Sequence, residues 1–501
     1  MLLTGSITKP EELWNQTWHW LVEDIAYHYT KSIANTELHI TDEHLKNLTL
    51  GGTGKTYIWR TLATSLKANN QIFIMVVSSG IASLLLLGGR TAHSKFKIPI
   101  PIFEDSTCNI HQGSQSADLL NQTSLIIWDE APMAHKFCFE ALNQSLIDII
   151  QQKNNSNHIF GGKVIVFGGD FQQILPVIPR GSRSDIINAT INSSYLWSCC
   201  EVLRLTKNMC LKANLQSIDD QETATFAKWI LDIGDGIIGY ENDGYATVEI
   251  PNDLLITKYD NPIDAIVKSR FPDLCQHHNN PEFFKCRAIL ASTNETVEEV
   301  NAYILSLIPG QHMEYLSYDV GDKSKSIDSF YFQSITIEFL NSLTTSSLAS
   351  HSIKLKIGCP IMLLRNLDQT QGLCNGTRLI VTKLAKHVIA AEIISGKNLG
   401  HNVYIPRMSM SPSQSPWPFK LLRRQFLIML SYAMTINKSQ GQSLSMVGLY
   451  LPKPVFSHGQ LYVVLLKVNS RKGLKILIHD KDQKSMTSTT NVVSKEAFKN
   501  L

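Results

Sequence analysis

Residues 51–56 read GGTGKT, and the run YIWRTLATSLKA that follows them is typical of a helix. Glycines let backbone N–H groups curl around a phosphate, and the N-terminus of the next helix adds its dipole. In such a loop Lys55 reaches the terminal phosphates and Thr56 holds Mg²⁺ through its hydroxyl. The stretch therefore predicts an α/β protein with a phosphate-binding loop made of Gly51, Gly52, Thr53, Gly54, Lys55 and Thr56. The alternative is a chance glycine turn.

The residues just before this loop depart from the usual pattern. The full pattern, G-x-x-x-x-G-K-[ST], needs a glycine at position 49, where this chain has Thr49 followed by Leu50. The preceding run TDEHLKNLTL is polar and favours a helix, although a buried strand should precede such a loop. We therefore expect the first sheet to lack that strand, and a strand over Leu45–Leu50 would count against this expectation.

Two further strands end in groups that suit nucleotide chemistry. LIIWDE at 125–130 ends in two carboxylates, of which Asp129 would hold Mg²⁺ through water and Glu130 would activate the attacking water. Val164–Phe167 runs into GGDFQQ, which places Asp170 and Gln173 where a γ-phosphate sensor would lie. The alternative is an ordinary strand end in the first case. In the second case it is a polar turn whose side chains form hydrogen bonds with its own backbone.

The hydrophobic pattern predicts two α/β units in tandem. Short runs rich in β-branched or aromatic residues alternate with helical stretches, which indicates buried parallel strands. We expect strands at Ile72–Val77, Leu125–Trp128, Val164–Phe167, Ala288–Leu290, Ile361–Leu364, Leu379–Val381, Phe426–Leu430 and Val447–Leu451. Arg407–Pro418 is predicted to be a loop because of its serines and prolines.

Charge is unevenly distributed along the 501 residues. The net charge is only +3, but Ser352–Leu501 carries 21 Lys/Arg against 5 Asp/Glu. A basic C-terminal third favours a polyanionic partner, and nucleic acid is the commonest candidate, although a solvated lysine-rich surface is the alternative. Thr91 and His93, in GGRTAH, could contact a nucleic-acid backbone, although a lone histidine is more often part of a core.

Membrane insertion is not expected. The longest strongly apolar run, Ile74 to Leu87, is interrupted by serines and a glycine. It is shorter than the about 20 residues that a bilayer span requires. The first residues also lack a basic region followed by an apolar core, so no secretory signal is predicted.

Several strings together identify a family resemblance. They are SSGIASLLLLGGRTAHSKFKIPI, IIWDEAPMAHKFCFEALN, FGGDFQQILPVIPRGSR, LTKNM, CNGTRLIV, AMTINKSQGQSL and LPKPVFSHGQLYVVLLKV. They resemble the petite-integration-frequency (PIF) family of DNA helicases, in the form found beside plant helitron transposons. The resemblance covers Gly51 to Leu477, and the join at Leu50–Gly51 looks like an internal deletion.

The resemblance implies a motor with two RecA-like domains that binds ATP and Mg²⁺ in the cleft between them. It also implies 5′ to 3′ movement along single-stranded DNA, action at duplex junctions and a nuclear location. On this resemblance Lys55, Glu130, Gln173 and Lys467 are assigned to catalysis, Thr56 and Asp129 to the metal, and Gly441 to the nucleotide. Thr91, His93, Thr435, Lys438, Ser439 and Gln440 are assigned to DNA. Base stacking on aromatics would add to lysine and arginine contacts with the backbone.

The resemblance to this family also predicts domain boundaries. We expect a helical N-terminal segment outside the motor (1–47), a first RecA-like domain with the ATP site (48–208), a helical connecting region (209–280), a second RecA-like domain (281–480) with a small β-rich insertion at about 385–420, and a tail (481–501).

Two arginines of the family pattern are replaced, which leaves more than one function open. Cys210 follows LTKNM where the family has arginine, and Lys467 stands in VLLKV where the family reads A-L-S-R-V. An arginine supplied to phosphoryl transfer is worth about 10³–10⁵ in rate, and lysine lacks its planar fork. The hypotheses are an active ATP-dependent helicase in repair, recombination or transposon replication, a degenerate relic that binds nucleic acid without unwinding it, and a P-loop enzyme acting on small molecules.

Overall fold

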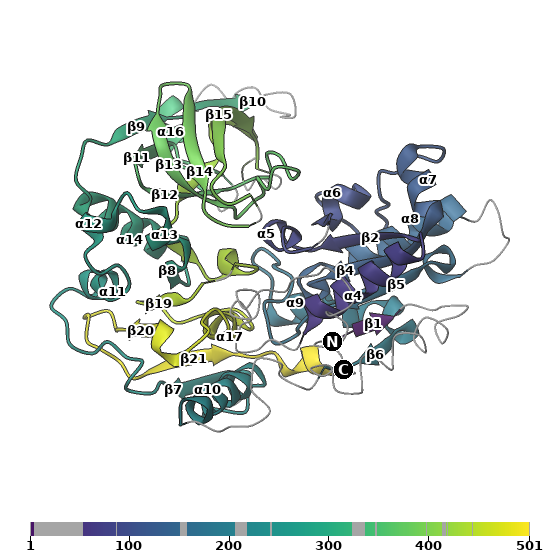
Figure 1. Cartoon of the computed structure of the whole chain (residues 1–501), viewed down its shortest axis with the longest axis horizontal. Coiled ribbons are helices and arrows are strands. Elements are labelled where there is room, and N and C mark those ends of the chain that lie inside the picture. Colours follow the sequence, from purple (N-terminus) through teal and green to yellow (C-terminus); the bar gives the residue numbers. More distant parts are fainter. Residues whose placement is uncertain are drawn as a thin grey trace.

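The computed structural model describes residues 2–4, 54–86, 88–150, 158–205, 218–240, 243–322, 336–345, 348–396, 398–412, 417, 419–442, 444–499 and 501. Within these ranges the chain forms two sheets built from parallel strands and a separate antiparallel β-rich unit (Figure 1). The predicted α/β fold with two tandem units is confirmed. No helix in this described part of the chain is long and apolar enough to cross a membrane.

The first sheet carries the predicted apolar strands. Its order is β3-β2-β4-β5-β1-β6, with β1 at Leu2–Thr4, β2 at Ile72–Val77, β3 at Arg90–Thr91, β4 at Thr123–Asp129, β5 at Val164–Gly168 and β6 at Glu201–Leu203. β2, β3, β4 and β5 are parallel, and most of their apolar residues are buried, as expected for a sheet covered on both faces. Its helices are α4 (Lys55–Ala68), α5 (Gly80–Ser83), α6 (Ala92–Phe96), α7 (Gln115–Gln122), α8 (Lys136–Ile150) and α9 (Arg183–Asn188).

An N-terminal strand lies inside this sheet. β1 pairs antiparallel with both β5 and β6, in register Leu3 to Phe167 and Leu3 to Val202. The place between β5 and β6 is thus taken by a strand that runs against the parallel set. The segment Leu45–Leu50, on which the predicted missing strand depends, lies outside the described residues.

The second sheet is parallel throughout. Its order is β18-β8-β19-β20, with β8 at Arg287–Ala291, β18 at Ala433–Thr435, β19 at Met446–Leu451 and β20 at Leu474–Ile478. The neighbouring helices are α10 (Ile218–Gly234), α11 (Pro262–Arg270), α12 (Leu274–His277), α13 (Pro281–Lys285), α14 (Asn294–Leu307) and α17 (Gln460–Leu465). Because the strands are apolar on both faces, they are buried between these helices and the β-rich unit.

The antiparallel unit is wider than the insertion predicted at about 385–420. Its main sheet has the order β10-β16-β15-β14-β13-β12-β17, with β10 at Tyr318–Asp322, β12 at Pro360–Leu363, β13 at Arg378–Leu384, β14 at Val388–Ile393, β15 at Asn402–Met410, β16 at Lys420–Phe426 and β17 at Ile428–Leu430. A second pair joins β9 (Met313–Leu316) to β11 (Ser352–Leu355), and α16 spans Ile337–Ser342. The loop prediction is therefore wrong for Arg407–Met410, because pairing with β16 determines the structure of that segment.

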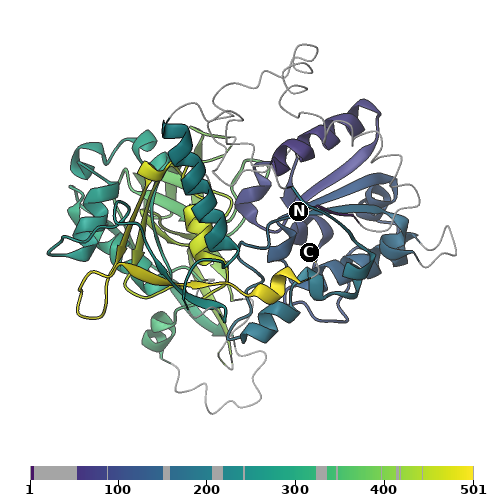
Figure 2. The same ribbon diagram turned by 90° about the horizontal axis from the view of Figure 1, so that it is seen from below.

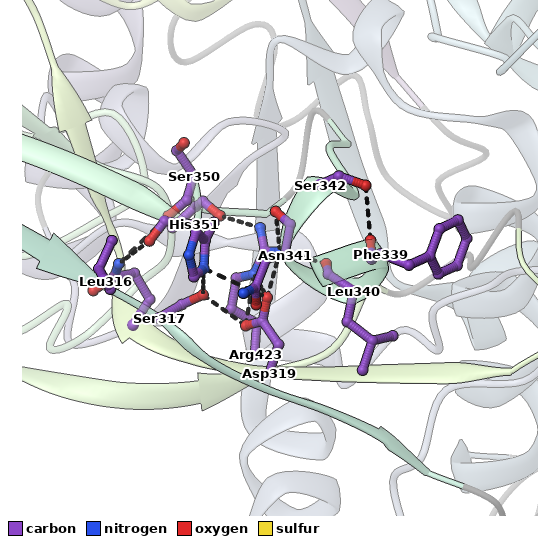
Figure 3. Close-up of polar contacts among 12 residues, drawn as sticks. Leu316, Ser317, Asp319, Phe339, Leu340, Asn341, Ser342, Ser350, His351 and Arg423 are labelled. Carbon is purple, nitrogen blue, oxygen red and sulfur yellow. Dashed lines mark hydrogen bonds and ion pairs between the residues drawn. The ribbon is translucent and has the colours of Figure 1, made fainter. Parts of the chain in front are cut away.

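A buried ion pair holds the β-rich unit together (Figure 3). The guanidinium of Arg423 lies 2.6 Å from Asp319 Oδ2, and both side chains are fully buried. Arg423 also donates to the carbonyls of Leu340 and Ala349, both at 3.0 Å. Ser317 donates to Asp319 Oδ1 at 2.7 Å and contacts His351 Nδ1 at the same distance. Strands β10 and β16 and helix α16 are thus tied to one charged centre.

Removing the cation of this pair should destabilise the β-rich unit strongly. Arg423→Met should lower the free energy of unfolding by about 3–5 kcal/mol, because it leaves the Asp319 carboxylate buried without its partner. Urea unfolding followed by circular dichroism measures the change. The control is Arg424→Met, since Arg424 is exposed on the same strand and should change stability by less than about 0.5 kcal/mol. Equal effects of the two substitutions would contradict the prediction.

The C-terminal segment links the two parallel sheets. β21 (Ser488–Val492) pairs antiparallel with β7 (Tyr245–Glu249), and η7 (Lys495–Phe498) then reaches the first domain. Ala497 is fully buried in the first domain's core, and Glu496 lies 2.8 Å from Arg183. Both chain ends accordingly lie beside the first sheet (Figures 1 and 2). Residues 481–501, predicted as a tail, thus include a strand and a core contact.

Candidate active site

The described part of the phosphate loop has the backbone geometry that the sequence pattern requires. Gly54 caps α4 with φ 84°, in the left-handed region that favours glycine. Lys55 starts the helix, and the Ile58 N–H donates to the Gly54 carbonyl at 3.1 Å. Thr56 is exposed in the first turn. Gly51–Thr53, also predicted to bind the nucleotide, lie outside the described residues.

Lys55 meets the two acidic residues that end β4. Its Nζ lies 3.2 Å from Glu130 Oε1 and 3.7 Å from Asp129 Oδ1. Glu130 has φ 52°, a strained conformation for a residue other than glycine, and its N–H donates to Asp129 Oδ1 at 3.0 Å. The turn after β4 therefore directs both carboxylates toward the N-terminus of α4.

These charges shift one another's protonation. Burial alone would lower the pKa of Lys55, but the negative charges of Glu130, Asp129 and Asp170 outweigh burial and raise the pKa. Burial is the main cause that raises the pKa of Glu130, while Lys55 opposes the shift. Lys55 is therefore held as a cation. Glu130 is a better proton acceptor than an ordinary surface carboxylate, as a general base requires.

The loop after β5 lies beside this pair and touches the second domain. Gln173 Nε2 donates to Asp170 Oδ2 at 3.2 Å, and the Gln172 N–H donates to Asp170 Oδ1 at 3.0 Å. Gln440 Nε2 then donates to Gln173 Oε1 at 3.1 Å, across 267 residues of sequence. We call Asp170–Gln173 the sensor loop. The predicted γ-phosphate sensor thus sits at a contact between the two domains.

The second domain also contributes a buried cation. Lys467 follows α17 and is 8% exposed. Burial lowers the pKa of Lys467 to about 8, and the charge of Glu130 acts in the opposite direction. Lys467 is therefore within electrostatic reach of Glu130 at the end of β4, although it belongs to the other domain.

Gly441 and Thr91, one of the predicted DNA residues, contact residues of the other domain. Gly441 has φ 78°, and an added Cβ would lie 2.8 Å from Ile81 Cγ2, so close packing against the first domain needs glycine there. Gln369 Nε2 donates to Thr91 Oγ1 at 3.4 Å, again between domains. His93 Nε2 lies 3.8 Å from Cys138 Sγ, and burial lowers the pKa of His93.

The four predicted DNA residues of TINKSQ are not alike in their surroundings. Thr435 ends β18 and is partly exposed, while Lys438 lies 2.9 Å from Met429 Sδ. Burial lowers the pKa of Lys438, and Glu298 opposes this. Ser439 is fully buried and donates to the Ile436 carbonyl, and Gln440 donates to Gln173 of the sensor loop. DNA contact by all four stays a prediction.

The residues of the site suit ATP and Mg²⁺. Thr56 and Asp129 offer a hydroxyl and a carboxylate, and oxygen ligands are what Mg²⁺ prefers. The N-terminus of α4 and Lys55 provide positive charge for phosphate groups. Gly168 lets β5 approach α4 closely, since an added Cβ would lie 2.2 Å from Trp59 Cζ2. The donor set and the close backbone packing thus fit a nucleotide with its metal.

Comparison with known proteins identifies relatives of this chain. A family model described as PIF1-like helicase matches residues 31–244, and one described as the 2B domain of DNA helicase Pif1 matches residues 338–384. These matches support a place for the chain in the PIF1-like helicase family. The second match falls within the β-rich unit, which is therefore similar to the 2B domain of those helicases.

Curated PIF1 helicases resemble this chain over most of its length. The Xenopus laevis ATP-dependent DNA helicase is 25% identical over 438 residues, which is 86% of this chain and 58% of the Xenopus protein. The human helicase is 25% identical over 439 residues, 86% of this chain and 57% of the human protein. A Bdellovibrio bacteriovorus Pif1 is 24% identical and matched over 82% of its own length. The chain thus spans less than two thirds of the vertebrate relatives.

Solved Pif1 structures show the same fold. Bacteroides Pif1 bound to single-stranded DNA superposes with a TM-score of 0.59 at 21% identity, covering 85% of this chain and 86% of that one. The Candida albicans Pif1 helicase gives 0.57 at 21% identity, covering 91% and 95%. The chain therefore has the fold of Pif1 helicases, with two RecA-like α/β units and a β-rich addition.

Sequence reasoning did not identify one residue that the structure places at this interface. Tyr462 donates its hydroxyl to Asp170 Oδ2 at 3.2 Å, although 292 residues separate them. Nothing in the sequence singles out Tyr462, because its neighbours in QLYVVL are apolar and it reads as a core residue. Only its burial beside a carboxylate distinguishes it.

Proposed function

We propose that this chain is an ATP-dependent DNA helicase motor that moves along single-stranded DNA and opens duplex at junctions. The observation that carries the proposal is the contact of Lys55 with Asp129 and Glu130 at the edge of the first sheet. The second domain supplies Gln440 and Lys467 to the same site. A site shared by two domains suits a motor, since events at the nucleotide can change the position of one domain against the other.

Each residue has a defined task in this proposal. Lys55 binds the terminal phosphates, and Glu130 takes a proton from the attacking water. Thr56 and Asp129 would hold Mg²⁺, which neutralises charge on the phosphates when bound. Lys467 replaces the arginine of the family pattern as a cation supplied by the second domain.

DNA binding is supported by charge and by a relative. The basic surplus of Ser352–Leu501 suits a phosphate backbone. Bacteroides Pif1, whose fold this chain shares, is described as bound to single-stranded DNA. Thr91, His93, Thr435 and Lys438 are the proposed contacts on this chain, with forked or junction DNA as the proposed substrate.

The biological setting is a further part of the proposal. The quoted motif strings support a helitron-like branch of the family, and Thr49–Leu50 before the loop supports an internal deletion there. Repair, recombination or transposon replication in the nucleus follows from the substrate class.

The test is ATP hydrolysis by the purified chain with and without single-stranded DNA. We expect hydrolysis that rises when DNA is added. DNA binding should also weaken with salt, and the slope of log K against log salt should be about −0.7 for each phosphate neutralised on a single strand.

Two other results would assign the chain differently. DNA binding without ATP hydrolysis would indicate a degenerate relic that retains the helicase fold. The replacement of two family arginines by Cys210 and Lys467 is the specific reason to consider it. ATP hydrolysis together with DNA binding that does not depend on salt would exclude a DNA motor. A P-loop enzyme acting on small molecules would then be the remaining hypothesis.

A further inference from the structure

The sensor loop is joined to the second domain by several hydrogen bonds. Gln173 accepts from Gln440, Asp170 accepts from Tyr462, and the Phe171 carbonyl lies 2.7 Å from His458 Nε2. Two of these partners, His458 and Tyr462, flank the start of α17, whose C-terminal end leads to Lys467. One short segment of the second domain therefore contacts the sensor and also carries the cation.

Tyr462 is fitted tightly into this contact. It is 2% exposed, and an added Cβ at Gly234, the last residue of α10, would lie 2.7 Å from its ring. Burial, and next the charge of Asp170, raises the pKa of Tyr462 well above its ordinary value. The phenol therefore stays protonated and can donate only to an acceptor such as Asp170 Oδ2. That same oxygen accepts from Gln173 Nε2, so Tyr462 and Gln173 share one anchor.

His458 makes a second connection with a defined tautomer. Its Nδ1 accepts from the Ser494 N–H at 2.8 Å, while its Nε2 faces the Phe171 carbonyl. A carbonyl can only accept and an N–H can only donate, so the imidazole must be neutral with its proton on Nε2. Burial, the largest cause, lowers the pKa of His458 to about 4, which agrees with this assignment. His458 thereby connects the sensor loop to the C-terminal segment.

The segment between these two side chains also fits closely. Gly459 has φ 72°, and an added Cβ there would lie 2.4 Å from the Gln172 carbonyl oxygen. No side chain fits at this position, and the backbone of the second domain therefore lies directly on the sensor loop.

We propose that Tyr462 and His458 are positioning residues that orient Gln173 toward the γ-phosphate. The proposal rests on the proposed function, because it assumes that the site binds ATP. Without the phenol hydroxyl, Asp170 loses one of its two side-chain partners and can turn away, and the Gln173 amide then loses its fixed orientation. Without His458, the sensor loop separates from the C-terminal segment.

The test compares the binding of ADP with that of the non-hydrolysable triphosphate adenylyl imidodiphosphate, each with Mg²⁺. Tyr462→Phe should reduce the preference for the triphosphate by about tenfold, because a hydrogen bond to a charged group is lost. The affinity for ADP should not change, since ADP has no γ-phosphate. Tyr450→Phe is the matched control, because Tyr450 is equally buried and its hydroxyl contacts His479, away from the sensor loop.

Two substitutions at His458 separate its two hydrogen bonds. The amide of His458→Gln can reach the Phe171 carbonyl, and the amide of His458→Asn can reach the Ser494 N–H. If the bond to the sensor loop positions Gln173, His458→Gln should keep more of the triphosphate preference than His458→Asn. A merely structural role would alter binding of both nucleotides alike.

The outcomes distinguish this inference from the proposed function. A wild-type chain with no preference for the triphosphate would overturn both. A wild-type preference that Tyr462→Phe leaves intact would overturn only the positioning role. A tenfold loss in Tyr462→Phe with full preference in Tyr450→Phe supports the role even in a chain that hydrolyses ATP slowly, because neither ligand needs to be cleaved.

Discussion

Lys55→Ala should abolish ATP hydrolysis and with it any stimulation by DNA. Lys55 is the cation nearest the predicted phosphate position, and it also compensates Glu130 and Asp129, which lie 3.2 and 3.7 Å away. Its loss leaves two neighbouring carboxylates without their counterion at a place where phosphates must bind. We therefore expect weak nucleotide binding as well as loss of turnover.

Glu130→Gln separates binding from chemistry at the same site. The substitution keeps the size of the side chain but removes the proton acceptor, so hydrolysis should fall by about 10²–10⁴. Nucleotide affinity should hold or rise, since one negative charge leaves the site. Steady-state hydrolysis and equilibrium binding of a fluorescent ADP analogue measure the two effects.

The control for both substitutions lies on the same helix as Lys55. Lys67→Ala removes an exposed lysine from the last turn of α4 and should change neither hydrolysis nor binding. Hydrolysis that survives Lys55→Ala at the wild-type rate would come from another protein in the preparation or from another site, and would remove Lys55 from the mechanism.

After Lys55, Lys467 should be the position where substitution lowers ATP hydrolysis most. Lys467→Ala should lower kcat by about 10³ or more if the lysine does the work of the family's arginine. Lys467→Arg should raise kcat above wild type, because a planar guanidinium can bind phosphate oxygens in pairs. The exposed Lys472, shortly after it in the chain, is the control position for Lys467→Ala.

The pH dependence of hydrolysis provides an independent measure of Lys467. Its pKa is lowered to about 8, so Lys467 is charged below this pH and becomes neutral as pH rises through it. The kcat/KM value, which reports the free enzyme, should therefore fall on the alkaline side with a midpoint near that pKa. In Lys467→Arg the fall should disappear, because arginine keeps its charge. A wild-type profile that stays flat up to pH 9.5 would contradict a role for the lysine cation.

Local patterns predict the parallel strands of the first sheet well. Ile72–Val77 is β2 to the residue, and the runs at Leu125 and Val164 lie inside β4 and β5. Such strands are apolar on both faces, so burial favours them wherever they pair, and their sequence alone is informative. The patterns also place Ile361–Leu364 and Leu379–Val381 in a parallel sheet, which is wrong, because β12 and β13 pair antiparallel in the β-rich unit. Phe426–Leu430 was less well predicted, because the chain divides it between β16 and β17.

The loop prediction fails in β15 for a physical reason. The strand includes a proline and a serine, so its composition resembles a loop. Pairing with β14 and β16 stabilises it, and those partners are determined by the whole unit. The buried Arg423–Asp319 pair is likewise unpredictable from sequence, since each residue alone reads as a surface charge.

The sequence by itself predicted the chemistry proposed for this protein: a loop for phosphate, an acidic pair at the end of a strand, a sensor loop and a basic C-terminal third. Each depends on residues close together in the chain, whose geometry follows from one turn or one strand end. The tertiary structure alone decided which distant residues share the site. Tyr462 and Gln440 reach the sensor loop across 292 and 267 residues, and Lys467 comes within reach of Glu130. Such contacts arise only when the two sheets pack against each other, because no local preference encodes them.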